Sequence, residues 1–554
     1  MSDQKPSQNR MVMIVMLLLV SGCNSAPASP TLVPRPNVSA TLTLVPQPTA
    51  SAPLPTAAPP ATLTAEPAAL WEDATKATIG VTGQWTNKVE LADINGDGRV
   101  DILFANGGDY ETPGTPVVSR VFLNQGSGNM FKEVTQEVFG PVGMLARVIK
   151  VRDVNGDEQP DILVGTTFQT QSQLYLADGA GKFSNVTATH LPAISASIGD
   201  AEFGDVDSDG DLDVVLADWG PGSPMSNSGG RTLLWLNDGT GHFSDATSTR
   251  MPNTLVKFSW ELEFVDVDND YDLDILVSCK KCAGSFFFEN DGAGMFTDVT
   301  KGRLPQFTNN YEFEAMDVNA DSYLDLVTIN DGGLSEHVFL NDRHGGFENA
   351  TTQLWPTSEN PSRDDNMVAF LDFDSDGDAD FLIGSLDGPD RLLINDGAGH
   401  LKVANSVFKG NGTPGTLAIA LAELNGDHKL DVVQAQGETA VDDRVFLGTN
   451  IQPDTASPII TLVEQIPSSG PGQAIWIGAR VHDNKSPTMP HDWQSVVVRW
   501  SANGQTNETP MQWYGEYLWR GVIDEQPTGP LSYQVCATDA AGNNACSELL
   551  TVTR

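Results

Sequence analysis

The sequence predicts an all-β protein. A nonapeptide with acidic or amide residues at positions one, three, five and nine recurs seven times, and the copies start 51 to 61 residues apart. Short apolar segments rich in β-branched residues flank each copy, and no useful helical periodicity occurs between residues 71 and 450. This period suits one four-stranded blade with its loops. We therefore expect a seven-bladed β-propeller at residues 71–450, followed by an Ig-like or fibronectin-type β-sandwich at residues 451–554.

The first 23 residues have the organisation of an export signal. Lys5 and Arg10 make the start basic, and Met11–Val20 is an apolar segment too short to span a bilayer. Residues 20–23, Val-Ser-Gly-Cys, resemble the lipobox of bacterial lipoproteins. The resemblance implies that Cys23 carries acyl chains that hold the protein on the extracytoplasmic side of a bacterial membrane. An ordinary signal peptide cleaved at a small residue is the alternative.

Residues 24–70 are rich in Pro, Thr, Ala and Ser, and their only charged residues are Arg35 and Glu66. Such a composition cannot bury enough apolar surface to fold, and its prolines favour an extended chain. We expect this segment to be a disordered, semi-rigid tether that lifts the folded part away from the membrane.

The charge of the chain excludes two classes of partner. Acidic residues number 73 and basic residues 31, which gives a net charge of -42. Nucleic acids and anionic lipid surfaces are bound through clustered Lys and Arg, so we expect no nucleic-acid partner and no electrostatic docking on lipid. Apolar residues make up 40% of the chain, enough for a sizeable core. We expect the chain to act as a monomer.

Each repeat unit contains the same succession of predicted strands. After the last Asp of the nonapeptide comes an apolar segment such as Ile102–Phe104, and further on a strand that ends in Asn or Asp, such as Leu234–Asn237. A Gly-rich turn then leads to a short last strand. The seventh unit lacks this last strand, whereas Trp71–Thr75 supplies one before the first nonapeptide. We therefore predict that the strand at Trp71 completes the seventh blade and closes the ring, which removes unpaired sheet edges.

The nonapeptides have the ligand pattern of calcium loops. Ca²⁺ takes six to eight oxygen ligands at about 2.3–2.6 Å. A tight loop supplies them from the side chains at positions one, three, five and nine and from the backbone carbonyl at position seven, so we expect up to seven ions. The candidate ligands are Asp93, Asn95, Asp97, Arg99 and Asp101; Asp153, Asn155, Asp157, Gln159 and Asp161; Asp205, Asp207, Asp209, Asp211 and Asp213; Asp266, Asp268, Asp270, Asp272 and Asp274; Asp317, Asn319, Asp321, Tyr323 and Asp325; Asp372, Asp374, Asp376, Asp378 and Asp380; and Glu423, Asn425, Asp427, Lys429 and Asp431.

The seven copies are not equivalent. The third, fourth and sixth have Asp at all four side-chain positions, and we expect these to bind Ca²⁺ most tightly. Gly98, Gly210 and Gly377 ease the sharp turn after position five. The second copy has Pro160 at position eight and the seventh begins with Glu423, which predicts weak or empty sites. The alternative, that Asp, Asn and Gly simply favour turns, explains one copy better than seven aligned ones.

The nonapeptides and their flanking strands resemble the FG-GAP or VCBS repeats, which also form the propeller at the N-terminus of integrin α chains. The resemblance extends over residues 71–450. It implies a calcium-binding propeller used for recognition at cell surfaces, and it does not imply an integrin partner.

The strand order places the acidic loops and the Gly-rich turns on one face of the ring. The other face collects longer and more variable loops, including Gly107–Pro116, Asp218–Gly230 and Cys279–Ser285, which suits a recognition surface. Aromatic side chains there could serve as platforms for sugars or as anchors for proteins, with packing between blades as the alternative. The aromatic candidates are Trp85, Tyr110, Trp219, Tyr311 and Trp355.

The sequence contains no recognised catalytic motif: the HExxH, GxSxG, P-loop and Rossmann patterns are absent. We therefore predict a non-catalytic protein that binds or adheres to an extracellular protein or glycan. One alternative is a calcium-dependent polysaccharide lyase or hydrolase, whose site would assemble from distant residues. The other is a purely architectural envelope protein.

Two local cysteine pairs remain besides Cys23. Cys279 and Cys282 form a CxxC without the βαβ context of a redox motif and without a second CxxC for zinc. Because export permits disulfides, we predict a structural disulfide or two free thiols there. Residues 451–554 lack the nonapeptide and end in a segment that looks like the last hairpin of an Ig-like or fibronectin-type sandwich, where Cys536 and Cys546 are placed to pair.

Overall fold

A computed structural model describes residues 69–553, apart from residues 127–129, 180, 361, 411–414, 471–472 and 525–529. The predicted export signal, the predicted lipidation site Cys23 and nearly all of the predicted tether lie outside the described residues. Within the described part of the chain, no helix is long and apolar enough to cross a membrane.

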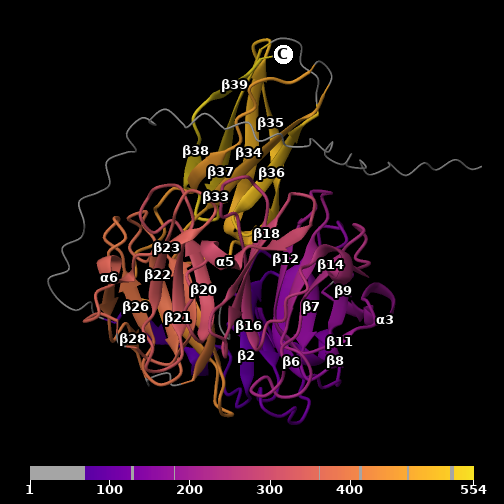
Figure 1. Ribbon diagram of the computed structural model, residues 1–554, viewed down its shortest axis with the longest axis vertical. Helices are drawn as coiled ribbons and strands as arrows, with labels where there is room; N and C mark the ends of the chain where they lie inside the picture. Colours follow the sequence, from indigo (N-terminus) through magenta and orange to yellow (C-terminus); the bar gives the residue numbers. More distant parts are fainter. Residues whose placement is uncertain are drawn as a thin grey trace, which may run out of the picture.

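The repeat units form a seven-bladed propeller, as predicted (Figure 1). Each blade contains four antiparallel strands, and the first two of them enclose the nonapeptide. From first to fourth strand, the blades are β2 (Thr86–Ala92), β3 (Asp101–Asn106), β4 (Arg120–Asn124) and β5 (Phe131–Glu133); β6 (Ala146–Arg152), β7 (Asp161–Thr166), β9 (Gln173–Ala177) and β10 (Phe183–Asn185); β12 (Ile198–Gly204), β13 (Asp213–Asp218), β14 (Thr232–Leu236) and β15 (Ser244–Asp245); β16 (Ser259–Val265), β17 (Asp274–Cys279), β18 (Phe286–Asn290) and β19 (Phe296–Asp298); β20 (Asn310–Met316), β21 (Asp325–Asn330), β22 (His337–Asn341) and β23 (Phe347–Asn349); β24 (Asp365–Leu371), β25 (Asp380–Ser385), β26 (Arg391–Ile394) and β27 (Lys402–Ala404); and β29 (Thr416–Ala422), β30 (Asp431–Gln436), β31 (Arg444–Gly448) and β1 (Trp71–Asp73). A small extra sheet pairs β8 (Thr170–Gln171) with β11 (Ser195–Ala196).

The second strand of each blade is apolar on both faces because neighbouring blades cover both. Every residue of β3, β7, β17, β21, β25 and β30 is buried. This explains the continuous apolar segments that follow each nonapeptide, where an exposed sheet would alternate apolar with polar residues. The hydrophobic core is accordingly a series of clusters that each span adjacent blades.

A single turn of helix follows the fourth strand in six of the blades. The hydroxyl of the Thr that begins each helix accepts the N–H of the third strand of the same blade, at 2.9–3.1 Å. These helices are α1 (Thr75–Thr78), α2 (Thr135–Val138), α3 (Thr187–His190), α4 (Thr247–Arg250), α5 (Thr300–Arg303) and α6 (Thr351–Leu354). The recurring Thr therefore fixes the exit of each blade toward the next.

The strand at Trp71 closes the ring, as predicted. In β1, Trp71 pairs with Gly448 and Asp73 with Phe446 of β31, in antiparallel register. The Trp71 side chain is fully buried, and its indole N–H donates to the Leu430 carbonyl at 2.9 Å. A further strand, β28 (Phe408–Lys409), pairs in parallel with the outer side of β1, so this blade has five strands.

The C-terminal part is a second all-β unit with its own apolar core. Its strands form one continuous sheet in the order β32-β33-β36-β35-β34-β37-β38, with β39 also paired to β37. Because β35 pairs with both β36 and β34, the two halves are not separate sheets, and the predicted Ig-like or fibronectin-type sandwich is not confirmed. The strands are β32 (Ile459–Val463), β33 (Ile475–His482), β34 (Trp493–Ala502), β35 (Gln505–Gly515), β36 (Leu518–Ile523), β37 (Leu531–Asp539), β38 (Asn544–Cys546) and β39 (Leu550–Val552), with one 3-10 turn, η1 (Pro490–Asp492).

This C-terminal unit stands on the face of the propeller that carries the acidic loops (Figure 1). The Tyr514 carbonyl accepts the N–H of Asp205, and the Tyr514 hydroxyl donates to the Tyr271 carbonyl, both at 2.8 Å. Ser486 donates its N–H to the Phe370 carbonyl at 3.1 Å. The unit therefore covers one face of the ring and leaves the opposite face, which bears the variable loops, uncovered.

We predict that Trp71→Ala destabilises the propeller by about 3–5 kcal/mol, because it leaves a cavity in the closing blade and removes the hydrogen bond to Leu430. Chemical unfolding of the two proteins measures the difference. Glu72→Ala is the matched control, because Glu72 lies on the same strand as Trp71. Its exposed ion pair with Lys409 contributes at most about 1 kcal/mol to stability. Equal stability of Trp71→Ala and Glu72→Ala would contradict the closing role of this strand.

Candidate functional site

All seven nonapeptides adopt the same backbone conformation. Positions four and six have positive φ in every copy, between 58° and 99°. Gly98, Gly210 and Gly377 adopt this conformation freely at position six. The other four copies hold a residue with a side chain there at a cost of about 1–2 kcal/mol each; they have Glu158, Tyr271, Ser322 and His428. The predicted turn after position five is therefore present in all copies, including those without Gly.

The aspartate at position nine joins each loop to its blade. One of its oxygens accepts the N–H of position two, and the other accepts an N–H at the end of the third strand, at 2.7–3.4 Å over the seven copies. The residues are Asp101, Asp161, Asp213, Asp274, Asp325, Asp380 and Asp431, each at most 3% exposed. This side chain therefore sets where the loop lies over the sheet.

Burial raises the pKa of the position-nine carboxyl in every copy. The pKa rises to about 7 for Asp101 and Asp161 and to about 8 for Asp325 and Asp431, with the neighbouring loop carboxylates adding to the rise. The cause is the loss of water around a charged group. A carboxylate in this position needs a proton or a nearby cation at neutral pH.

The third, fourth and sixth loops bring three carboxylates together. In each, one oxygen of three aspartates lies within 4.8 Å of the others: Asp205, Asp207 and Asp213; Asp266, Asp268 and Asp270; and Asp372, Asp374 and Asp380. The other loops have Asn at position three and form no such triad among the described residues. Oδ1 of Asp207 and Oδ1 of Asp374 are buried and have no hydrogen-bond partner. These all-oxygen donor sets with unsatisfied oxygens fit a hard cation such as Ca²⁺.

The seventh loop differs in its first residue. In the first six copies, Oδ2 of the position-one Asp accepts the N–H of position six at 2.7–3.3 Å. Glu423 instead uses Oε1 for the N–H groups of Asn425 and Asp427, at 2.8 and 3.1 Å. Its longer side chain therefore places the carboxylate differently, which is consistent with the weak site predicted there.

Two arginines of the C-terminal unit reach the acidic loops. Arg520 Nη1 lies 2.7 Å from Asp205 Oδ2 in the third loop. Arg480 Nη2 lies 3.2 Å from Asp266 Oδ2 in the fourth and also donates to Asn269 at 2.7 Å. In the sixth loop, none of the described Arg or Lys residues forms an ion pair with Asp372. The three Asp-rich loops thus differ in how their charge is balanced.

A recurring asparagine links five of the seven loops to the next blade around the ring. At the end of the third strand, its side-chain N–H₂ donates to the position-two carbonyl of the preceding blade's loop, at 2.8–2.9 Å. The residues are Asn124, Asn237, Asn290, Asn341 and Asn395. Blades two and seven have Ala177 and Gly448 at this place. These five acidic loops are thereby part of the interface between blades.

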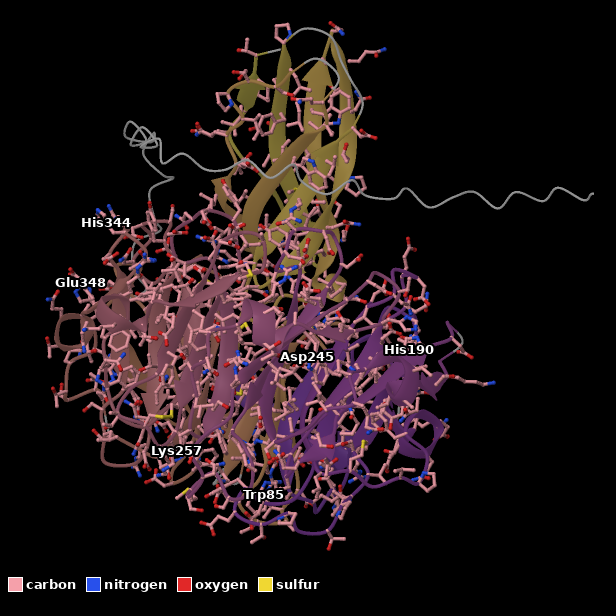
Figure 2. The ribbon with its side chains drawn as sticks, turned by 45° about the vertical axis from the view of Figure 1, so that its right-hand side comes forward. Trp85, His190, Asp245, Lys257, His344 and Glu348 are labelled. Carbon is pink, nitrogen blue, oxygen red and sulfur yellow. A yellow bond between two sulfur atoms is a disulfide. The ribbon has the colours of Figure 1, made fainter. Side chains whose placement is uncertain are left out.

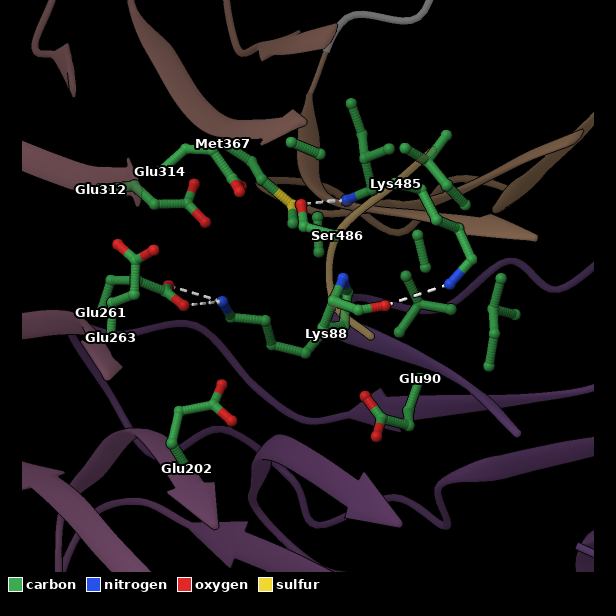
Figure 3. A pocket seen from close by; sticks show the side chains of 18 of the residues that line it. Lys88, Glu90, Glu202, Glu261, Glu263, Glu312, Glu314, Met367, Lys485 and Ser486 are labelled. Carbon is green, nitrogen blue, oxygen red and sulfur yellow. Dashed lines mark hydrogen bonds and ion pairs between the residues drawn. The ribbon is translucent and has the colours of Figure 1, made fainter. Parts of the chain in front are cut away.

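The central channel is lined by charged side chains on the first strands of five blades (Figure 3). Lys88 Nζ lies 2.6 Å from Glu261 Oε1, and Arg152 Nη1 lies 2.9 Å from Glu90 Oε1. Lys485, Ser486 and Glu516 of the C-terminal unit close the channel over a cavity of about 100 Å³. The carboxylates that line it are Glu90, Glu202, Glu261, Glu263, Glu312, Glu314 and Glu516.

This lining carried a signal that the sequence analysis missed. The signal lies at two positions, three and five residues before the nonapeptide begins. The third, fourth and fifth copies have an acidic residue at both positions, whereas the sixth and seventh copies have Met or Ala there. Residues that alternate in this way share one side of a strand. Aligning the repeats upstream of the loops would therefore have predicted an acidic channel.

A pocket with a volume of about 290 Å³ lies on the uncovered face, at the opposite mouth of the channel. Figure 2 shows Trp85 and Lys257 on this side, away from the C-terminal unit. Its walls come from loops of several blades and include Tyr110, Phe258, Lys280, Lys281, Tyr311, Asp331, Asp364 and Glu438. The predicted recognition loops therefore do converge, at the axis of the ring.

Lys280 lies inside an aromatic cage at this pocket. Its Nζ is 3.9 Å from the ring centroids of both Trp260 and Tyr311, and its side chain is almost fully buried. Burial lowers the pKa of Lys280 to about 7, and the faces of the rings favour its charged form. Beside it, Lys281 pairs with Asp331 at 3.0 Å, and Asp364 Oδ1 is buried without a hydrogen-bond partner.

A disulfide between Cys279 and Cys282 holds the two lysines on one short loop, and Cys536 and Cys546 form a second disulfide across β37 and β38. Of the aromatic candidates, Tyr110 and Tyr311 line the pocket. Trp219 and Trp355 are at most 1% exposed and pack in the core, which is the alternative the sequence left open. Trp85 is half-buried and packs against the same cluster.

Comparison with known proteins identifies the repeats. Four segments match the FG-GAP-like repeat: residues 93–164, 153–216, 317–383 and 372–433. Each begins at the first residue of a nonapeptide and ends in the second strand of the next blade. No curated protein sequence matches the chain. The chain therefore contains FG-GAP-like repeats, and they are blades of a seven-bladed propeller.

Several solved structures share part of the arrangement. An Agrocybe aegerita lectin that recognises non-reducing terminal N-acetylglucosamine is 18% identical over 58% of this chain and 82% of its own, with a TM-score of 0.36. The V. cholerae biofilm matrix protein Bap1 is 15% identical over 85% of this chain and 73% of its own, with a TM-score of 0.32. A Penicillium chrysogenum alpha-L-arabinanase is 10% identical over 71% of this chain and 99% of its own, with a TM-score of 0.33. At these TM-scores, none of them bears on the function of this chain.

We predict that the Tm falls as the pH rises from about 6 to about 8 in excess Ca²⁺. Burial raises the pKa of Glu314 and of Glu516 to about 8, so each is protonated when folded and ionised when unfolded over this range. Each such carboxyl lowers the free energy of unfolding by about 1.4 kcal/mol per pH unit until its folded pKa is passed. Thermal unfolding of Glu516→Gln should show a shallower pH dependence than the wild type. If the Tm of Glu516→Gln depended on pH as steeply as that of the wild type, the assignment of a raised pKa to Glu516 would be wrong. Glu348→Gln, which changes an exposed residue of β23, is the control.

Proposed function

We propose that the protein is a calcium-binding propeller at the bacterial cell surface, anchored through lipid on Cys23, that binds an extracellular glycan without catalysis. The observation that carries the proposal is the pocket at the uncovered mouth of the channel. It combines aromatic rings with carboxylates and a buried lysine, and it lies opposite the C-terminal unit. The disulfides and the export signal in the sequence support an extracytoplasmic location.

Calcium has a structural role in this proposal. The position-nine carboxylates are buried at the points where loop and sheet meet, and a divalent cation in the loop would neutralise them while the backbone bonds stay intact. Arg520 and Arg480 already supply one positive charge each to the third and fourth loops. The sixth loop has five aspartates and, within the described residues, no such arginine. We therefore expect the sixth loop to depend most on Ca²⁺.

The pocket suits a hydroxyl-rich ligand. Carboxylates of Asp364 and Glu438 can accept hydrogen bonds from sugar hydroxyls, and the edge of Tyr110 offers apolar surface to a sugar ring. The buried Asp364 Oδ1 has no partner within the described protein, so a bound hydroxyl would satisfy it. An extracellular protein that presents the same groups is the alternative ligand.

One observation favours a second function, that of a carbohydrate-active enzyme. A lysine whose pKa is lowered to about 7 can act as a general base at neutral pH, and Lys280 lies beside Tyr311 and several carboxylates. A polysaccharide lyase needs such a base to take a proton from the sugar ring. The proposal of binding alone therefore has to be tested for cleavage as well.

A glycan array probed with the mature protein, with and without Ca²⁺, tests both functions when bound glycans and released products are read together. We expect binding without cleavage, and we expect Asp364→Asn to weaken it about tenfold or more, because it removes a charged hydrogen-bond acceptor. Glu348→Gln makes the same charge change on the exposed side of the propeller and should bind normally. Unsaturated sugar ends among the products would establish the enzyme instead. Absence of any glycan or protein ligand would favour an architectural envelope role.

Removal of Ca²⁺ by chelation is expected to lower the Tm. Each occupied site contributes about 2.7 kcal/mol when free Ca²⁺ is a hundredfold above its Kd. Asp376→Asn at position five of the sixth loop should remove a clear part of this stabilisation. Asp157→Asn makes the same change at position five of the second loop, where we expect weak binding, and should remove little. A Tm that chelation does not move would contradict the structural role of calcium.

A further inference from the structure

Three carboxylates outside the nonapeptides meet where the C-terminal unit joins the propeller. Asp454 lies in the segment between β31 and β32, Asp483 directly follows β33, and Asp539 ends β37. One oxygen from each lies within 4.8 Å of the other two. The three residues are distant in the sequence and come together only through the fold.

The oxygens of this cluster are buried and unsatisfied. Asp539 is fully buried; its Oδ1 accepts the N–H groups of Gly542 and Asn543 at 2.7 and 2.9 Å, whereas its Oδ2 has no hydrogen-bond partner. Oδ1 of Asp454 and Oδ1 of Asp483 are likewise buried without a partner. A buried carboxylate oxygen without a donor costs several kcal/mol, so a fold does not retain three of them together without a compensating group.

No basic side chain of the described residues forms an ion pair with these three aspartates. The ammonium group of Lys485 acts on Asp483, but it is already held by Asp492 Oδ2 at 2.7 Å and by the Pro487 carbonyl at 3.0 Å. Within the described part of the chain, no ion pair therefore balances the charge of the three carboxylates.

We propose that Asp454, Asp483 and Asp539 hold a Ca²⁺ ion that is separate from those of the nonapeptides. The donor set consists of carboxylate oxygens on three segments, which suits a hard cation that accepts six to eight oxygens in a flexible geometry. Two or three carboxylates binding through both oxygens, completed by water, would reach that number. The ion would satisfy the buried Oδ2 of Asp539 without disturbing the hydrogen bonds of its Oδ1.

The position of this site gives it a role in holding the two units together. Asp454 donates its N–H to the His428 carbonyl in the seventh acidic loop at 2.7 Å. Asn484, next to Asp483, accepts the N–H of Asp372 in the sixth loop at 2.9 Å. Asp539 belongs to the β37–β38 hairpin of the C-terminal unit. An ion bound to all three would therefore clamp the C-terminal sheet, the connecting segment and two loops of the propeller at one point.

Native mass spectrometry of the mature chain in Ca²⁺ tests the site by counting ions. We expect Asp483→Asn to bind one Ca²⁺ fewer than the wild type and Glu508→Gln to bind the same number as the wild type. Glu508 is the matched control because it pairs with Arg499 on the exposed surface of the same unit. An unchanged ion count in Asp483→Asn would overturn the proposal.

Hydrogen exchange of the wild-type chain with and without Ca²⁺ tests the site without any substitution. We expect Ca²⁺ to slow exchange in residues 454–456, 483–485 and 539–543, in particular at the amides of Gly542 and Asn543. Slowing confined to the seven nonapeptides would overturn the proposal even if calcium binds there. Slowing at residues 539–543 alone, with none in the nonapeptides, would support this site and contradict the calcium role proposed for the propeller loops.

Discussion

The rest of the propeller depends on the hydrogen bonds that the buried aspartate at position nine of each nonapeptide accepts. Its two oxygens join the start of the acidic loop to the end of the third strand, in every one of the seven blades. The asparagine at that strand end then bonds to the loop of the preceding blade in five of them. A group buried this deeply keeps its charge only beside a cation. Loop, blade and neighbouring blade are thus coupled through one carboxylate that favours metal binding.

The C-terminal unit uses the same acidic surface in a different way. Arg520 and Arg480 pair with the first carboxylates of the third and fourth loops, and Glu516 closes the channel above the ring of buried glutamates. Because this unit occupies the acidic face, a macromolecular ligand has access to the opposite face. That face contains the caged Lys280 and the pocket around it. In the proposed function, the acidic face serves stability and the opposite face serves recognition.

Most of the propeller could be predicted because its determinants are local and repeated. The spacing of the nonapeptides gave the number of blades, and the extra strand at Trp71 gave the closure of the ring. The docking of the C-terminal unit could not be predicted, because Arg480 and Arg520 follow no repeat and act on loops some 200 to 300 residues away. The cluster of Asp454, Asp483 and Asp539 was missed for the same reason. Trp219 and Trp355 look like surface aromatics in their loops, and only the fold shows that they are buried.

Anomalous diffraction from crystals grown in Ca²⁺ would test the central role of the position-nine aspartates most directly. We expect anomalous peaks in the acidic loops, with the sixth loop occupied, each within coordinating distance of a position-nine carboxylate oxygen, about 2.3–2.6 Å. Loops that keep the same conformation in millimolar Ca²⁺ but show no anomalous peak would contradict it. In that case the aspartates would serve only as hydrogen-bonded turns.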